Sequence, residues 1–136
     1  MTDQDFAEAF EACRRPNELF HHRDHLRLAW IYLQRYGARD APARIGESIR
    51  RYAAHHGKAE KYNETVTIAW LWLLAQASEC SGAASFAELL AACPELLDKN
   101  TLHRYYSPEL LASETARTQF VPPDRRTLPS ITRSAG

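Results

Sequence analysis

Three of the six histidines, His21, His22 and His25, fall within five consecutive residues. On a helix His22 and His25 lie about 60° apart, because successive residues are separated by about 100°. His21 and His25, four residues apart, form an alternative pair. Imidazole suits proton transfer near neutral pH, and helical histidines at these spacings can share a metal ion. The pattern predicts a catalytic acid/base pair at His22 and His25, or two ligands of a divalent metal such as Zn or Fe; two ligands alone do not make a metal site.

A second polar group precedes a strongly apolar stretch, VTIAWLWLLA. Here we predict that Glu64 is catalytic, orienting an imidazole or taking up a proton. Contacts to a substrate are predicted for four further residues: Tyr62, Asn63, Thr67 and Trp30. Two simpler interpretations stay open, since asparagine is also a preferred N-cap residue and tryptophans at helical spacing usually fill a core.

The elements that position these residues are predicted to be helices. Ala and Leu total 36 residues, against 7 for Val and Ile, and this balance favours helices over strands. Apolar periodicity, caps and breakers place the helices at 3–15, 24–36, 42–55, 63–79, 85–93, 95–106 and 107–120. We therefore expect an all-α, compact single domain over residues 1–120, a bundle of six to seven helices around the central apolar helix at 63–79. The proline-rich segment 121–136 is expected to form an extended tail.

Short loops between the second, third and fourth helices predict an up-down-up path that gathers the polar residues. The histidines of the second helix, the end of the third helix and the start of the fourth then lie at one end of the bundle, which the loop after the first helix also reaches. A polar mouth above an apolar floor is typical of a small-molecule pocket. The sequence does not decide whether five further residues reach this pocket: His55, His56, His103, Arg104 and Arg117.

Composition excludes several classes of protein. Lys plus Arg and Asp plus Glu number 17 each, so no global field attracts a nucleic acid. No apolar run approaches the roughly 20 residues that span a bilayer. The acidic N-terminus is unlike a secretory signal, which predicts a cytoplasmic protein. The three cysteines, Cys13, Cys80 and Cys93, are expected to be reduced core thiols. A homo-oligomer is compatible with the neutral net charge.

The segments that carry these residues resemble an uncharacterised family of small all-helical bacterial proteins, over about residues 18–129. The family pattern Phe-x-His-x-x-His-Leu matches Phe20, His22 and His25. The pattern Tyr-His-Glu-Thr-x-Thr matches Tyr62, Glu64, Thr65 and Thr67 and differs at Asn63, where the family has histidine. Later matches are Tyr105, Tyr106, Ser107, Pro123 and Asp124. With a histidine at position 63 the family would present three imidazoles, whereas Asn63 cannot titrate and is a poor ligand for Zn or Fe.

Two function hypotheses follow. The first is a small enzyme that acts on a small molecule by imidazole acid/base or metal-assisted chemistry. The second is a non-catalytic binding or accessory module for a metabolite, a peptide or a partner enzyme, with the tail prolines (Pro122, Pro123, Pro129) and the pair Tyr105 and Tyr106 as its contact surface. The substrate and the reaction are not encoded in these patterns.

Overall fold

The computed structural model describes residues 2–128, in which helices and loops occur and no strand does. The predicted all-α class is confirmed. The chain divides into two compact units, unit 1 (residues 1–62) and unit 2 (residues 63–136), and the prediction of a single domain over 1–120 stays a prediction. None of the helices within residues 2–128 combines the length and the apolar character needed to cross a bilayer.

Unit 1 begins with α1 (Asp3–Glu11), which is shorter than the predicted helix at 3–15. The helix ends early because Cys13 adopts a left-handed conformation with φ 59°. The backbone N–H of Arg14 then bonds to the carbonyl of Ala9, and that of Cys13 to Phe10, at 2.9 Å each. This is a Schellman motif, which usually has glycine at the left-handed position. Without a glycine there, the sequence gives no local sign of the helix end.

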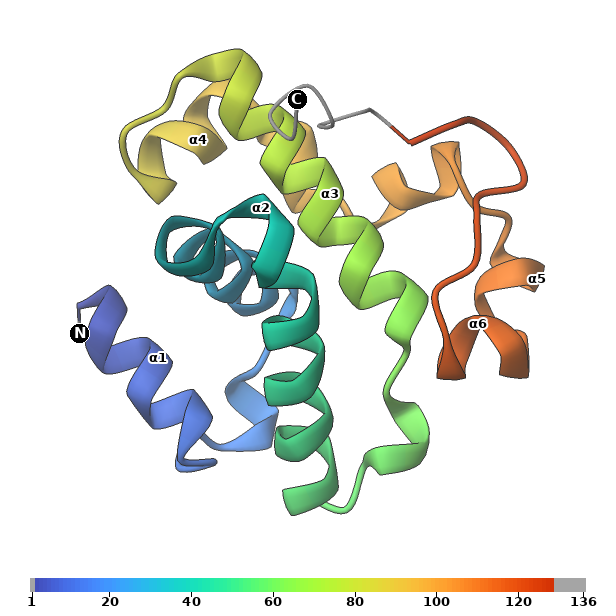
Figure 1. Ribbon diagram of the computed structural model, residues 1–136, viewed down its shortest axis with the longest axis horizontal. Helices are drawn as coiled ribbons and strands as arrows, with labels where there is room; N and C mark the ends of the chain where they lie inside the picture. The colour runs from blue at the N-terminus through green and yellow to red at the C-terminus, as the bar shows by residue number, and fades with distance from the viewer. Residues whose placement is uncertain (1, 129–136) are drawn as a thin grey trace. The chain divides into compact units, whose positions relative to one another are not determined.

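After a short 3-10 turn, η1 (Asn17–Leu19), the chain enters α2 (His22–His55), which consists of two helical arms. The arms meet at Gly37, whose φ of 81° and ψ of 166° are not helical. Figure 1 shows the change of direction between them. The two helices predicted at 24–36 and 42–55 correspond to these arms, but they join without a loop and the second arm already includes Pro42. A further 3-10 turn, η2 (Ala59–Lys61), closes unit 1.

A buried hydroxyl joins the three helical pieces of unit 1. Tyr32, on the first arm of α2, is 1% exposed. Its hydroxyl lies 2.7 Å from Ser48 Oγ on the second arm and donates to Glu11 Oε2 of α1 at 2.5 Å. Burial, first of all, raises the pKa of Tyr32, so the phenol stays protonated and remains a donor.

Unit 2 is arranged along α3 (Glu64–Ser81), the apolar helix predicted at 63–79. Gly82, with φ 67°, ends it. Ser85 caps α4 (Phe86–Ala92) by accepting from the Glu88 N–H at 3.1 Å. Both α4 and α6 (Glu114–Thr118) pack on α3, and Figure 1 shows them beside opposite ends of that helix.

Two expectations for unit 2 were wrong in detail. Residues 95–106 form 3-10 turns rather than an α-helix: η3 (Pro94–Leu97) and η4 (Lys99–Arg104). The helix expected at 107–120 is divided into α5 (Pro108–Leu111) and α6. Ser113 causes the division, because its Oγ donates to the carbonyl of Leu110 and accepts the N–H of Ala116, which caps α6.

Hydrogen bonds hold the first part of the predicted tail in place. We call residues 119–125 the strap. Asp124 accepts two hydrogen bonds from Ser107, from the backbone N–H at 2.8 Å and from Oγ at 2.6 Å. Tyr106 donates its hydroxyl to the carbonyl of Val121 at 2.6 Å, and Arg125 N–H bonds to the carbonyl of Tyr105 at 2.9 Å. No helix occurs in residues 121–128. Pro129 and the rest of the predicted tail lie outside the described residues.

Candidate functional site

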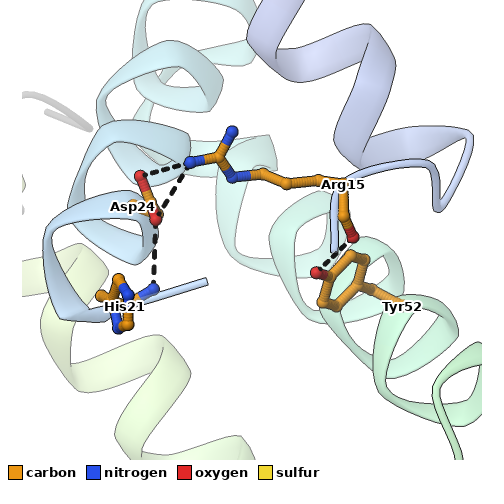
Figure 2. Close-up of polar contacts among 4 residues, drawn as sticks. All are labelled: Arg15, His21, Asp24 and Tyr52. Atoms are coloured by element: carbon orange, nitrogen blue, oxygen red, sulfur yellow. Dashed lines mark hydrogen bonds and ion pairs between the residues drawn. The ribbon is translucent and has the colours of Figure 1, made fainter. Parts of the chain in front are cut away.

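The start of α2 in unit 1 is fixed by a network around Asp24. Its Oδ2 accepts the backbone N–H of His21 at 3.1 Å, and both carboxylate oxygens lie 3.4 Å from Arg15 Nη2. The Arg15 carbonyl in turn accepts the Tyr52 hydroxyl at 2.7 Å. Figure 2 shows that this network connects the loop after α1, the first arm of α2 and the second arm. The position of the histidines is therefore set by contacts distant in sequence.

Aromatic contacts bring the two arms together at the histidines. The Phe20 ring lies 5.3 Å from that of Tyr52 and 6.4 Å from that of His25, between centroids. Tyr52 packs against His56 at 4.5 Å and stacks on Phe10 at 4.3 Å. We call Phe20, His25, Tyr52 and His56 the histidine–aromatic cluster. The structure thus brings a histidine from each arm to the same pair of aromatic rings.

The cluster and Arg15, whose carbonyl Tyr52 binds, contain buried nitrogens whose hydrogen-bonding capacity is unused. Among the described residues, His25 Nε2, His56 Nε2 and Arg15 Nε are buried and have no hydrogen-bond partner. An unpaired buried polar atom costs about 1–3 kcal/mol, so native proteins keep few of them. As whole residues, however, His25 and His56 are only partly buried.

The environment keeps His25 uncharged. Burial, and secondarily the nearby charge of His22, lower the pKa of His25 from 6.5 to about 4. At neutral pH its imidazole is therefore a neutral group that donates from one nitrogen and accepts at the other. Burial likewise raises the pKa of Tyr52, so its phenol is protonated and holds the Arg15 carbonyl.

Three other predicted site residues of unit 1 lie at different positions. His22 is partly buried at the start of α2, close enough to His25 to influence its charge. Tyr62 lies at the end of the unit, with the Arg50 guanidinium 5.8 Å from its ring centroid. Trp30 is 5% exposed and lines a separate surface cleft together with Asp3, Gln4, Ile31, Gln34 and Arg35.

The remaining predicted site residues belong to unit 2, where two have structural roles. Asn63 is the N-cap of α3: its Oδ1 accepts the Val66 N–H at 3.0 Å, and its amide donates to the Leu111 carbonyl at 2.8 Å. Thr67 is 3% exposed. Glu64 is half-buried in the first turn of α3, where a carboxylate favours the positive end of the helix dipole.

The motif residues that carried the resemblance also hold the strap in place. Thr65 is fully buried; its hydroxyl donates to the Gln119 carbonyl at 3.0 Å and accepts the Val121 N–H at 3.2 Å. Tyr106 is fully buried as well, so the prediction of its ring as a contact surface was wrong. Three of the residues for which the sequence left it undecided whether they reach the site have their contacts in unit 2. His103 Nδ1 lies 3.3 Å from the Tyr106 carbonyl, Arg117 pairs with Glu114 at 3.0 Å, and Arg104 lines a pocket described below.

No three His, Cys, Asp or Glu side chains within residues 2–128 are grouped so that they could hold a metal ion. The sequence offers two histidine pairs as ligands, His22 with His25 and, as the alternative, His21 with His25. The cysteines are free, as expected, but Cys80 is exposed and Cys13 and Cys93 are only partly buried. The expectation that all three are core thiols was therefore wrong.

The sequence alone assigned no role to Arg15 or to Tyr52. The available signal for Asp24 was its position three residues after His21, where a carboxylate can accept the N-cap N–H. Comparison with family models, with curated proteins and with solved structures finds no match to the chain. The resemblance described above stays a prediction.

Proposed function

We propose that the protein is a small enzyme that acts on a small polar molecule at the histidine–aromatic cluster, by imidazole acid/base chemistry. The observation that carries the proposal is the buried Nε2 of His25, which no described residue hydrogen-bonds. Nε2 of His56 and Nε of Arg15 are also buried and have no hydrogen-bond partner among the described residues. A ligand that bonds to these nitrogens would remove the cost of leaving them unpaired.

The neutral state of His25 defines what it can do. With a pKa of about 4, the imidazole is ready to accept a hydrogen bond or a proton at neutral pH without first losing its own. An anionic group on the substrate would favour the imidazolium and raise this pKa toward the range useful for general base catalysis. We therefore favour a substrate with a carboxylate or another anionic group. Tyr52 and Asp24 act as positioning residues through Arg15 and the start of α2.

The test uses the purified full chain and mixtures of small carboxylates, followed over time by proton NMR. We expect a compound that the wild type and His103→Gln, a change in unit 2, both consume, while His25→Gln binds it without turnover. Equal turnover by His25→Gln would refute the proposed role of His25. Thermal unfolding of each variant shows whether it is folded before activity is compared.

The alternative is a non-catalytic binding module, for which the sequence predicted a contact surface formed by the tail prolines and by Tyr105 and Tyr106. Binding at the histidine–aromatic cluster without turnover would fit it as well. Part of this predicted contact surface is not accessible to a partner, because Tyr106 is buried and only Tyr105 of the pair is partly exposed. Binding of a carboxylate that shifts the His25 ring signals but is never converted would favour this alternative over the enzyme.

The metal-assisted version of the enzyme remains a prediction for His22 and His25. Elemental analysis of protein expressed in metal-supplemented medium tests it directly. Zn or Fe at one equivalent in the wild type, lost in His22→Ala, would support the metal version. Asn63→His, which introduces the family's residue, is the informative companion: metal in that variant alone would show a three-histidine site that this chain lacks.

A further inference from the structure

Unit 2 contains a pocket that the proposed function does not use. It has a volume of about 230 Å³ and lies between α3, the end of α4 and the 3-10 turns η3 and η4. Its walls are mainly apolar, from Leu73, Ala77, Leu96 and the ring of Tyr105. Pockets for drug-sized ligands have about 300–1,000 Å³. The volume therefore suits a smaller molecule.

One polar group of the pocket lacks a hydrogen bond. Gln76 lines the pocket and donates from Nε2 to Cys80 Sγ at 3.1 Å. Its Oε1 is buried, and none of the described residues bonds to it. Because Gln76 lines the pocket, a donor on a bound molecule is a candidate partner for Oε1. The hydroxyl of Thr101, also on the wall, already donates to the Glu95 carbonyl at 2.7 Å.

The two charged residues of the lining have opposite signs. Arg104 and Glu95 are both exposed, so the lining carries no net charge that would favour an ion over an uncharged ligand. Two thiols, Cys80 and Cys93, complete the lining. Burial above all raises the pKa of Cys93, which keeps this thiol neutral at pH 7.

We infer that this pocket binds a small, predominantly apolar molecule that carries one N–H or O–H donor, which hydrogen-bonds to Gln76 Oε1. The apolar body packs against Leu73, Leu96 and Tyr105, and the single acceptor fixes its orientation. An apolar cavity with one polar group that orients the ligand is typical of small-molecule recognition. The inference concerns unit 2 alone and does not depend on the histidine–aromatic cluster.

The cysteines supply an internal readout for the native chain. Indole, which has one N–H donor, is the probe, and 1-methylindole, which lacks the donor, is its matched control. Iodoacetamide alkylation is followed by mass spectrometry at each cysteine. Bound indole should slow alkylation of Cys93, which lines the pocket, and leave Cys13 of unit 1 unchanged. One hydrogen bond is worth up to about tenfold in affinity, so 1-methylindole should need an up to about tenfold higher concentration for equal protection.

Two variants locate the effect. Gln76→Leu should abolish the difference between the two probes, whereas Gln34→Leu, a glutamine of unit 1, should preserve it. Ala77→Leu should fill part of the cavity and weaken protection by both probes. Equal protection by indole and 1-methylindole in the wild type would overturn the role of Gln76. Absence of Cys93 protection at the solubility limit of indole, or equal slowing at Cys13, would overturn the pocket itself.

Discussion

The neutral state of His25 predicts a specific loss of stability in mild acid. Its folded-state pKa is about 4, against 6.5 for an unperturbed histidine. Between these values the unfolded chain binds a proton that the folded chain does not. The free energy of unfolding therefore falls as the pH decreases from 6.5 to about 4, and this contribution is fully retained above that window.

The size of the effect follows from the same two values. A difference of one pKa unit corresponds to about 1.4 kcal/mol, so the whole shift is worth about 3 kcal/mol. Only part of that window lies between pH 7 and pH 5, where the expected loss from His25 is about 2 kcal/mol. The assay is urea unfolding at both pH values, for the wild type and for His25→Phe, which keeps an aromatic ring against Phe20 and cannot titrate.

The difference between the two proteins isolates His25 from the other ionisable groups. We expect the loss on going from pH 7 to pH 5 to be about 2 kcal/mol smaller in His25→Phe than in the wild type. His103→Gln, which leaves His25 in place, is the control and should retain the His25 contribution. Parallel pH dependence of the wild type and His25→Phe would refute both the burial argument and the neutral imidazole on which the proposed function rests.

Three further predictions concern the hydrogen bonds that hold each unit together. Tyr32→Phe should lower the free energy of unfolding by about 1–3 kcal/mol, because it removes one hydroxyl from two buried partners; an unchanged urea midpoint would contradict this. Asn63→Ala should cost about 1 kcal/mol through loss of the cap, while Asn63→Asp keeps the cap acceptor and should lose less; equal losses would show that the cap is unimportant. Asp124→Ala should release the strap and speed tryptic cleavage after Arg125, compared with Asp124→Asn, which keeps one carbonyl acceptor; identical cleavage rates for the wild type and Asp124→Ala would show that Asp124 does not hold the strap.

Helix ends were predictable where a local signal marks them. Gly37 and Gly82 both adopt positive φ, a conformation that costs glycine little, and both end the helical segments that the sequence predicted. Ser85 and Ser107 cap helices three residues before the N–H that each accepts. These signals depend on neighbours along the chain, which a sequence displays directly. Cys13 gave no such signal, because a residue other than glycine rarely adopts the left-handed conformation. Ser113 is the same residue type as the caps Ser85 and Ser107, but it lies inside a segment that the sequence predicted as one continuous helix.

The candidate site was less predictable because its contacts are distant in sequence. Tyr52 bonds to a carbonyl 37 residues earlier, and apolar periodicity along the predicted helix 42–55 does not reveal such a partner. Tyr106 was expected at the surface, but its hydroxyl donates to the Val121 carbonyl, 15 residues later. This hydrogen bond offsets the free-energy cost of burying the hydroxyl. Similarity to the family pattern gave no physical reason for grouping Tyr106, Ser107 and Asp124. The strap gives one, because Asp124 belongs to the strap and Tyr106 and Ser107 donate hydrogen bonds to strap residues.

The Thr65 contact has a consequence for synthesis of the chain. Thr65 lies in the first turn of α3, yet the Gln119 carbonyl that its hydroxyl bonds is made 54 residues later. At about 5–20 residues per second, a ribosome needs roughly 3–11 s to cover that distance. During this interval the first turn of α3 has no strap against it, and Thr65 can bond only to water or to other acceptors in the nascent chain. The Arg15–Tyr52 bond of unit 1 spans 37 residues, but both partners are made before α3, so co-translational folding should proceed in two stages.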